Sequence, residues 1–333
     1  MTARRQRTGR RVCSILGLLG GLLVPLAGGP AHAAERGYPA REIEFVVPFP
    51  PGGPADISAR IIAPRMASLL GVSVVVTNKP GGGGAVGAAF VANARPDGYT
   101  VYASTNPPLT ITTVIQKDVP YRMGDLVPVG SYAVDGNVFA VRADAPFRTL
   151  EELADYARKQ PGKLSYGSAG LGTVAFFTME LFKLSAGVDI AHVPFAGGGP
   201  LKNAILGGHV QVASTGISAL AAVIHSGNLQ PLAITSPMRL PAFPQIHTMA
   251  EKGYPEASLT IWMGLYVPAK APPAVVDVLG KALAQAARDP AVVGAVEKAG
   301  MQGEYRDAAA THRLLEAEHS AIRGAAQKLG MDK

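Results

Sequence analysis

Residues 46–56 read Val-Val-Pro-Phe-Pro-Pro-Gly-Gly-Pro-Ala-Asp and join an apolar run to a helical pattern. We interpret this stretch as the end of a strand, a stiff loop and a helix that begins near Asp56. Prolines fix φ and lack an N–H, whereas Gly52 and Gly53 leave bare backbone that another group can approach closely. Because a helix N-terminus carries partial positive charge, the loop is suited to an anion such as a carboxylate or phosphate.

The segments around this loop predict an alternation of strands and helices. Apolar, β-branched residues at 43–47 predict a strand that is buried on both faces. Apolar residues at helical spacing then predict a helix that Gly71 ends and that Pro64 kinks. The next predicted elements are a strand at 72–77, a short helix at 85–94 and a strand at 99–103.

The second half of the chain continues this alternation. Thr149 and Glu152 form a capping-box pattern for a helix that ends near Lys159. The predicted strands that follow are at 164–166, 191–193, 210–213 and 232–235, and the predicted helices are at 173–186, after Pro200 and at 218–226. Three tail helices come last: one begins near Pro273, one near Pro290, and the third carries Leu315 to Leu329. This order predicts an α/β fold with mixed, mostly parallel sheets.

Length and apolar content favour two domains. The chain has 333 residues, of which 48% are hydrophobic and 17% charged, so it can bury a large core. Residues 127–142 contain two β-like runs broken at 135–137, and we place the crossing into a second domain there. A second crossing at 262–267 returns the chain, and we expect Trp262 to be buried at it. The predicted division is a first domain at 34–135, a second at 136–260 and a return to the first at 261–333.

The first 33 residues have the pattern of an export signal. Five arginines precede an apolar run at 12–27, and Ala31-His32-Ala33 fits a cleavage site near Ala33. The run is too short and too rich in glycine to predict a transmembrane helix, so we expect an exported soluble protein. Arg10-Arg11 also permits a twin-arginine signal.

Export changes how the charge is interpreted. The formal net charge of +7 includes the five signal arginines, and the remainder carries 26 Lys and Arg against 24 Asp and Glu, a net of +2. This balance gives no reason to expect nucleic acid or an anionic membrane as a partner. The single cysteine, Cys13, lies within the signal, so the mature protein is predicted to have no disulfide.

Two further loops follow strands and are candidate binding sites. Ser104, Thr105 and Asn106 follow the third predicted strand. The glycine-serine loop at 167–173 places hydroxyls and bare N–H groups before a helix, which suits an anion, and its candidate residues are Ser168, Ala169, Gly170, Gly172 and Thr173. Thr173 also fits the N-cap of that helix. Asp56 is open to two interpretations, as an N-cap or as a fixed acceptor for ligand-bridging water.

Enzyme and metal patterns fit the sequence poorly. Residues 82–87 match a dinucleotide-binding pattern, but no acidic residue ends a strand at the required distance. The loop at Ser168 has Tyr166 where a hydrolase elbow has its first glycine, and the sequence indicates no base for this serine. The histidines are too dispersed for a metal motif, so we expect no metal site. Because the dinucleotide and hydrolase patterns also fit poorly, we expect no cofactor and no catalytic residue.

Several long motifs together resemble the tripartite tricarboxylate transporter substrate-binding receptors, often called Bug proteins. The matching stretches are residues 38–56, 78–87, 95–100, 166–173, 192–200, 207–212, 227–236 and 262–269. The resemblance implies a type II periplasmic binding protein with two α/β domains and two crossing strands. Such receptors close on a small carboxylated solute and deliver it to membrane permease subunits, and we expect a monomer.

The resemblance also implies which residues hold the ligand. It places a carboxylate between the loop of Phe49, Pro50, Gly52, Gly53 and Asp56 and the loop at 168–173. Phe176, Thr215 and the run Phe195-Ala196-Gly197 stand where relatives often have His, Asp and Tyr-Lys-Gly. We therefore add Phe195, Gly197 and Thr215 as ligand contacts and expect an apolar or aromatic carboxylate rather than a polyanion such as citrate. The alternatives are an exported sensor that signals its liganded state and, less favoured, an exported hydrolase.

Overall fold

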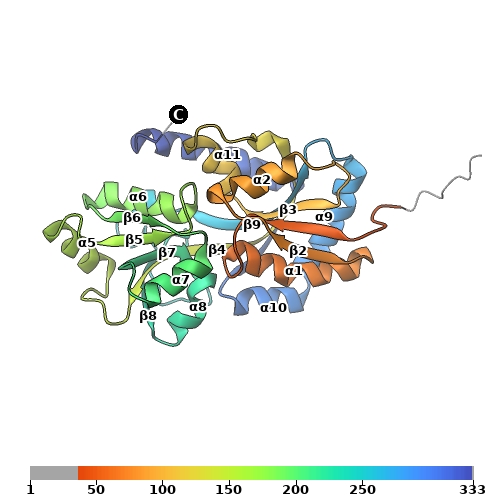
Figure 1. The fold of residues 1–333 in the computed structure, drawn as a ribbon. Coiled ribbons are helices and arrows are strands. Elements are labelled where there is room, and N and C mark those ends of the chain that lie inside the picture. Colours follow the sequence, from red (N-terminus) through yellow and green to blue (C-terminus); the bar gives the residue numbers. More distant parts are fainter. Residues whose placement is uncertain (1–36, 332–333) are drawn as a thin grey trace, which may run out of the picture. The chain divides into compact units, whose positions relative to one another are not determined.

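The computed structural model describes residues 37–331 (Figure 1). The predicted export signal lies outside these residues. Strand β1 spans Ile43–Val47, as predicted, and pairs in parallel with both β2 and β3. The other elements of this part are α1 (Pro54–Leu70), β2 (Val74–Asn78), α2 (Ala85–Ala92), β3 (Thr100–Thr105) and the short helices α3 (Pro107–Thr110) and α4 (Thr112–Ile115).

Helix α1 begins two residues before Asp56. Pro54 occupies its first turn and Gly53 is its N-cap, so the helix begins near Asp56 as predicted, but Asp56 is not its N-cap. Proline suits the first turn because its fixed φ matches the helix and its missing N–H would have no intrahelical partner. The helix continues through Pro64 and ends where Gly71 adopts a left-handed conformation, as predicted.

A second group of strands and helices follows. Parallel pairs join β5 to β6 and β5 to β7. The elements are α5 (Leu150–Lys159), β5 (Ser165–Ser168), α6 (Val174–Ala186), β6 (Ala191–Pro194), α7 (Gly198–Leu206), β7 (Val212–Gly216), α8 (Ile217–His225) and β8 (Leu229–Ile234). Thr149 caps α5 through a capping box with Glu152, and Thr173 caps α6, as predicted. Helix α7 begins before Pro200, at Gly198.

Two long antiparallel strands connect these groups. Strand β4 runs without a break from Leu126 to Arg142, so the predicted interruption at residues 135–137 is wrong. Residues 126–136 pair with β9 (Thr260–Pro268), and residues 137–142 pair with β7 and β8. The strand therefore changes partners where a domain crossing was expected. The domain division itself stays a prediction.

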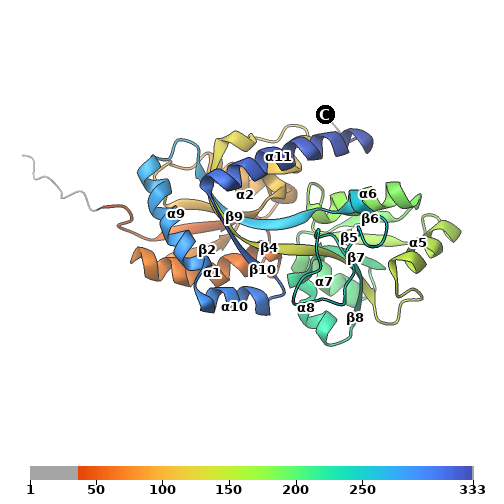
Figure 2. The same cartoon turned by 180° about the vertical axis from the view of Figure 1, so that it is seen from behind.

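The C-terminal part packs on the first group of strands. Helices α9 (Pro273–Ala287) and α10 (Pro290–Lys298) contact α1, and α11 (Ala308–Lys328) contacts β4. Figures 1 and 2 show α2 and α11 on one side of the sheet and α1 and α10 on the other. Strand β10 (Gln302–Asp307), which the sequence analysis did not predict, pairs antiparallel with β4.

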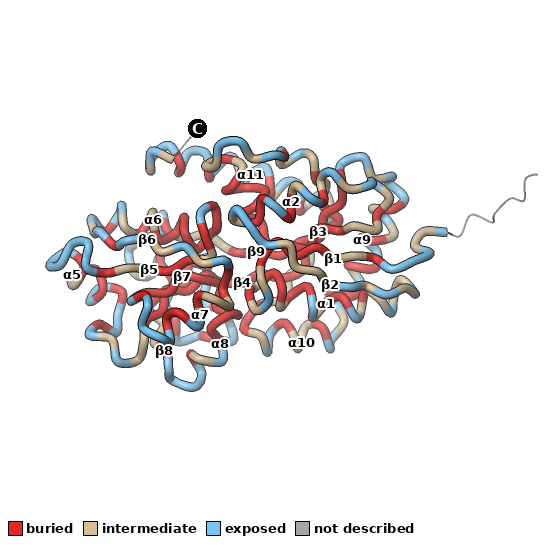
Figure 3. Tube along the Cα trace, in the orientation of Figure 1, coloured by how far each residue is buried: buried red, intermediate tan, exposed pale blue. Residues whose placement is uncertain are grey.

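The sheet is mixed, as predicted, and forms the buried centre of the described residues (Figure 3). The strand order is β2-β1-β3-β9-β4-β7-β5-β6, with β10 and β8 also pairing with β4. Parallel strands β1, β3, β5 and β7 direct their carboxyl ends toward loops that open helices. Within residues 37–331, no helix combines the length and apolar character needed to cross a membrane.

Candidate functional site

A cavity lies where the loops after β1, β3, β5 and β7 meet. The cavity is small, with room for only a few water molecules as the loops lie in this structure. Its lining residues are Phe49, Gly53, Pro54, Ala55, Thr105, Pro107, Ala169, Thr173, Val174, Ala175, Gly198, Thr215, Gly216 and Ile261. The site is thus assembled from segments that are distant in the sequence.

Four helix N-termini contribute to this lining. The N-cap or first turn of α1, α6, α7 and α8 reaches the cavity at Gly53, Thr173, Gly198 and Gly216. The side chain of Thr173 caps α6, whereas no side chain caps α1 or α7. Because uncapped first-turn N–H groups are hydrogen-bond donors without intrahelical partners, α1 and α7 offer the cavity a place for an anion.

The cavity has no charged wall. Among the described residues that line it, none has an ionisable side chain, and the polar ones are Thr105, Thr173 and Thr215. An anion in this site is therefore held by backbone N–H groups, threonine hydroxyls and helix dipoles rather than by Arg or Lys. The apolar side chains, among them Phe49, Val174 and Ile261, suit the hydrocarbon part of a ligand.

Six of the sequence-predicted site residues line the cavity: Phe49, Gly53, Thr105, Ala169, Thr173 and Thr215. The other ten lie beside it in the same loops and are not among its lining residues: Pro50, Gly52, Asp56, Ser104, Asn106, Ser168, Gly170, Gly172, Phe195 and Gly197. Several of these ten hold the loops in place, as their hydrogen bonds indicate.

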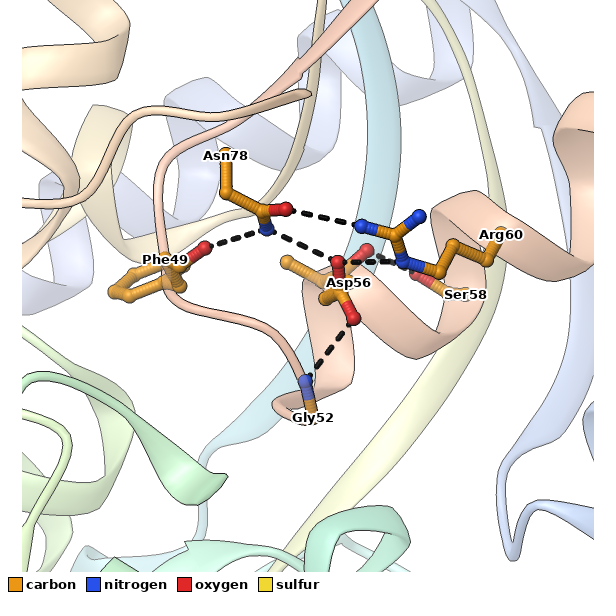
Figure 4. A network of polar contacts seen from close by, with 7 residues as sticks. Phe49, Gly52, Asp56, Ser58, Arg60 and Asn78 are labelled. Atoms are coloured by element: carbon orange, nitrogen blue, oxygen red, sulfur yellow. Dashed lines mark hydrogen bonds and ion pairs between the residues drawn. The ribbon is translucent and has the colours of Figure 1, made fainter. Parts of the chain in front are cut away.

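Asp56 braces the loop that precedes α1 (Figure 4). Its carboxylate accepts hydrogen bonds from the backbone N–H of Gly52 at 3.0 Å, from Arg60 Nε at 2.9 Å and from Asn78 Nδ2 at 3.0 Å. Asn78 Nδ2 also donates to the carbonyl of Phe49 at 2.8 Å. The carboxylate is almost fully buried and bound on both oxygens, so Asp56 is neither the N-cap nor a free acceptor facing the cavity.

Ser168 is paired with a histidine that the sequence analysis did not connect to it. His192 Nε2 lies 2.8 Å from Ser168 Oγ, and the N–H of Gly170 donates to the same hydroxyl at 3.2 Å. Thr173 Oγ1 donates to the Gly170 carbonyl at 2.7 Å. The expectation that Ser168 has no base nearby is therefore wrong, because parallel pairing of β5 with β6 sets Tyr166 beside His192.

The arrangement of Ser168 and His192 suits a structural role in the loop rather than that of a nucleophile and its base. Ser168 is fully buried and does not line the cavity. The ring of His192 contacts the rings of Tyr166 and Phe176 in tilted arrangements, with centroid distances of 4.8 Å and 4.9 Å. Burial lowers the pKa of His192, which favours the neutral imidazole. A neutral ring that fixes Ser168 also fixes the N–H of Gly170 and thereby the shape of the loop.

Asn106 ties the loop after β3 to the crossing strand and to α11. Its side chain accepts from the N–H of Trp262 at 3.1 Å and donates to the carbonyl of Thr260 at 3.2 Å and to Glu318. Trp262 is buried in β9, as expected, and its Nε1 donates to Glu318 at 2.7 Å. Burial raises the pKa of Glu318, opposed by hydrogen bonds from Trp262, Thr110 and Asn106.

Direct contacts join the two sets of loops. Thr112 Oγ1 donates to the Gly172 carbonyl at 3.2 Å, and Gln116 Nε2 donates to the carbonyl of Leu171 at 3.2 Å. A Cβ added at Gly197 would lie 3.0 Å from Pro50 Cδ. These contacts place the loop before α1 and α4 against the loops before α6 and α7.

Eight lining residues escaped the sequence analysis: Pro54, Ala55, Pro107, Val174, Ala175, Gly198, Gly216 and Ile261. Most occupy a helix N-cap or first turn directly after a predicted loop. The rule that parallel strands end in ligand-binding loops applies equally to these positions and could have found them. Ile261 lies in β9, and no local pattern indicates that it reaches the cavity.

Comparison with known proteins gives consistent matches. The family model of the tripartite tricarboxylate transporter family receptor matches residues 58–331. Protein BugT of Bordetella pertussis is 35% identical over 277 residues, which cover 83% of this chain and 85% of BugT.

Solved structures agree with this match. The periplasmic binding protein BugD is 31% identical, with a TM-score of 0.84 over 89% of this chain and 100% of BugD. The R. palustris protein Rpa4515, solved with adipate, is 29% identical, with a TM-score of 0.84 over 88% of this chain and 98% of that protein.

Proposed function

This chain belongs to the tripartite tricarboxylate transporter receptor family, and on that premise we propose that it captures a small carboxylate in the cavity described above. The observation that carries the proposal is that the uncapped N-termini of α1 and α7 reach one cavity without a charged wall. Such a site can hold a carboxylate through N–H groups and hydroxyls. Adipate in Rpa4515 supports the same ligand class.

We propose that the ligand has an apolar or aromatic body and few negative charges. Each further carboxylate would need its own donors, because an unpaired charge is costly to move from water into a partly enclosed site. The lining offers the hydroxyls of Thr105 and Thr215 and a few free N–H groups, whereas the hydroxyl of Thr173 is already bonded to Gly170 and Phe176. Phe176 contacts His192, and Phe195 lies against Gly167 and Gly170, so both are apolar side chains close to the loop before α6.

The proposed role is capture and delivery. The receptor would be exported to the periplasm, bind its solute as a monomer and pass it to membrane permease subunits of the tripartite type. We propose no catalytic step. Ser168, which pairs with His192 as in part of a hydrolytic site, is buried behind the loop, and Glu180, the acidic group that acts on His192, is bound to Tyr166 and Lys183.

Calorimetry on the mature chain tests this function and its ligand preference. The panel should contain hexanoate, benzoate, adipate and citrate, with melting temperatures measured in parallel. We expect hexanoate or benzoate to bind more tightly than citrate and to raise the melting temperature, because a ligand that binds only the folded state stabilises it. Tight binding of citrate with no binding of the monocarboxylates would contradict the preference. Binding of no carboxylate would contradict the function.

A further inference from the structure

A buried carboxyl group lies behind the wall of the proposed carboxylate site. Asp135 is in β4, at the point where this strand changes partners, and is fully buried. Its Oδ2 accepts a hydrogen bond from Ser218 Oγ at 2.6 Å, and its Oδ1 accepts from the backbone N–H of Ser218 at 3.4 Å. These donors lie in the first turn of α8 and favour a negative charge on Asp135, whereas the burial of its carboxyl group disfavours one.

Asp135 is separated from the cavity by a thin layer of atoms. A Cβ added at Gly216 would lie 2.3 Å from Asp135 Oδ2 and 2.4 Å from the Cγ of Pro54. Gly216 and Pro54 both line the cavity, as does Ile261, which pairs with Asp135 across the two crossing strands. Only glycine leaves room for the carboxyl group at this distance. A charge on Asp135 therefore acts on the cavity through a short path of protein with low dielectric constant.

The charged groups on the neighbouring elements do not offset this charge. On α1, Arg60 is paired with Asp56, and on β10, Arg306 is paired with Glu304. Glu318 on α11 lines a second cavity together with Asp135 and is also a carboxyl group, so it supplies no positive charge. On α8, the remaining titratable group is His225, which stacks on Phe243 at a centroid distance of 4.8 Å.

We propose that Asp135 is a specificity-determining residue that limits the negative charge of the ligand. When its carboxyl group is ionised, it repels an anion in the cavity, and the repulsion is stronger for a dianion than for a monoanion. The inference rests on the proposed function, since it concerns the same cavity. Asp135 does not line the site, so its repulsion is a separate reason, beyond the lining residues, for the site to prefer weakly charged ligands.

Asp135 changes between its neutral and charged forms near neutral pH. Burial raises the pKa of Asp135 to about 7, opposed by the hydrogen bonds from Ser218 and from the N–H of Ile217. The carboxyl group is therefore mostly neutral below this pH and mostly charged above it. Since an anion in the cavity favours the neutral form, binding of a carboxylate is coupled to uptake of a proton.

Hexanoate and adipate test this inference, because they match in chain length and differ by one carboxylate. Their dissociation constants should be measured by calorimetry between about pH 6.5 and 8.5, where both acids are fully ionised. The variants are Asp135→Asn and, as a control of equal charge change, Asp144→Asn at an exposed surface position. Ser218→Ala is a second probe, because it removes a donor that stabilises the charged form of Asp135.

We expect the affinity of the wild-type protein for both acids to fall as pH rises through about 7. At the upper end of the range, Asp135→Asn should strengthen adipate binding by roughly tenfold and hexanoate binding by less, and it should flatten the pH profile. Ser218→Ala should move the midpoint of the profile to higher pH. Asp144→Asn should behave like the wild type.

Two results would overturn the inference separately from the function. If Asp135→Asn binds adipate and hexanoate with the wild-type ratio and pH profile, Asp135 does not set the ligand charge. If that variant does not fold, an unshifted profile in Ser218→Ala leads to the same conclusion. Binding of neither acid, nor of benzoate, to the wild-type protein would instead contradict the proposed function, and the inference would fall with it.

Discussion

Asp135 has an ionisable carboxyl group that is completely buried. Ionisation of this group should lower the stability of the folded protein by a measurable amount. Its pKa is about 7 in the folded protein and near 3.8 in an unfolded chain. Between these values the folded state binds more protons than the unfolded state, so stability falls as pH rises from about 4 to about 7. Above that window the charged carboxyl group stays buried at a constant cost.

We therefore predict that Asp135→Asn is more stable than the wild type at high pH. Three pKa units correspond to at most about 4 kcal/mol, and the gain should be absent near pH 4, where both forms are neutral. Urea unfolding at several pH values measures the difference. Asp144→Asn is the control, because its carboxylate is exposed. A pH dependence that Asp135→Asn shares with the wild type would contradict the assigned cause.

Gly53 is a second residue whose size matters. It is the N-cap of α1 with φ of −94°, an angle that any residue can adopt. A Cβ at Gly53 would lie 3.7 Å from the backbone N of Gly198, which is ordinary contact, but the methyl groups of valine would extend into the space between the two loops. The effect of a substitution there should therefore fall on the ligand site rather than on the backbone.

We predict that Gly53→Val abolishes carboxylate binding and leaves the fold intact. Calorimetry measures the binding, and circular dichroism with thermal melting checks the fold. Gly294→Val is a matched control, because Gly294 lies in α10 and a Cβ added there would meet no atom within 4 Å. Wild-type affinity in Gly53→Val would show that the close approach of α1 and α7 does not form part of the site.

At the scale of elements, the loop between β5 and α6 depends on a chain of hydrogen bonds. His192 holds Ser168, Ser168 holds the N–H of Gly170, and Thr173 holds the Gly170 carbonyl. Since Ala169 and Thr173 line the cavity, the chain fixes two lining residues from behind. We propose that Ser168 positions the loop rather than binding the ligand directly.

A double-mutant cycle tests this role. Ser168→Ala and His192→Ala should each weaken carboxylate binding by about 1 to 3 kcal/mol, and the double variant should lose less than the sum, because both changes break the same chain. Calorimetry at a fixed pH gives the three differences. Additive losses would indicate that the two side chains act on the ligand separately.

Elements with a strong local pattern were predictable, and those that depend on distant partners were not. Residues 43–47 were predicted as β1 without error, because a buried parallel strand is a continuous apolar run. Strand β10 was missed, since its residues are polar and partly exposed and only pairing with β4 makes it a strand. Thr105 was predicted in a loop but belongs to β3, because pairing with Met263 of β9 extends that strand.

The same distinction applies to the site. The loops that contain Phe49, Gly53 and Thr173 could be found from glycine, proline and hydroxyl residues between a strand and a helix. Contacts between segments distant in sequence, such as His192 with Ser168, depend on the strand order and were not predictable. Asp135 was predicted to be part of a break in the strand, whereas it lies within β4 and behind the cavity.

At the scale of the whole described chain, the architecture explains how a neutral site can select an anion. The crossing strands β4 and β9 join two groups of parallel strands whose loops meet at one cavity. Each group supplies helix N-termini, so that donors from both sides are brought together only by the complete fold. The contacts of Thr112 and Gln116 with the loop before α6 hold the two groups of loops together around the cavity.

A crystal structure of the mature protein with the tightest carboxylate of the panel tests the central claim most directly. We predict that the carboxylate oxygens lie within hydrogen-bonding distance of backbone N–H groups at the N-termini of α1 and α7, with the hydrocarbon part against Phe49, Val174 and Ile261. A carboxylate bound to an Arg or Lys side chain, or bound outside this cavity, would contradict the account.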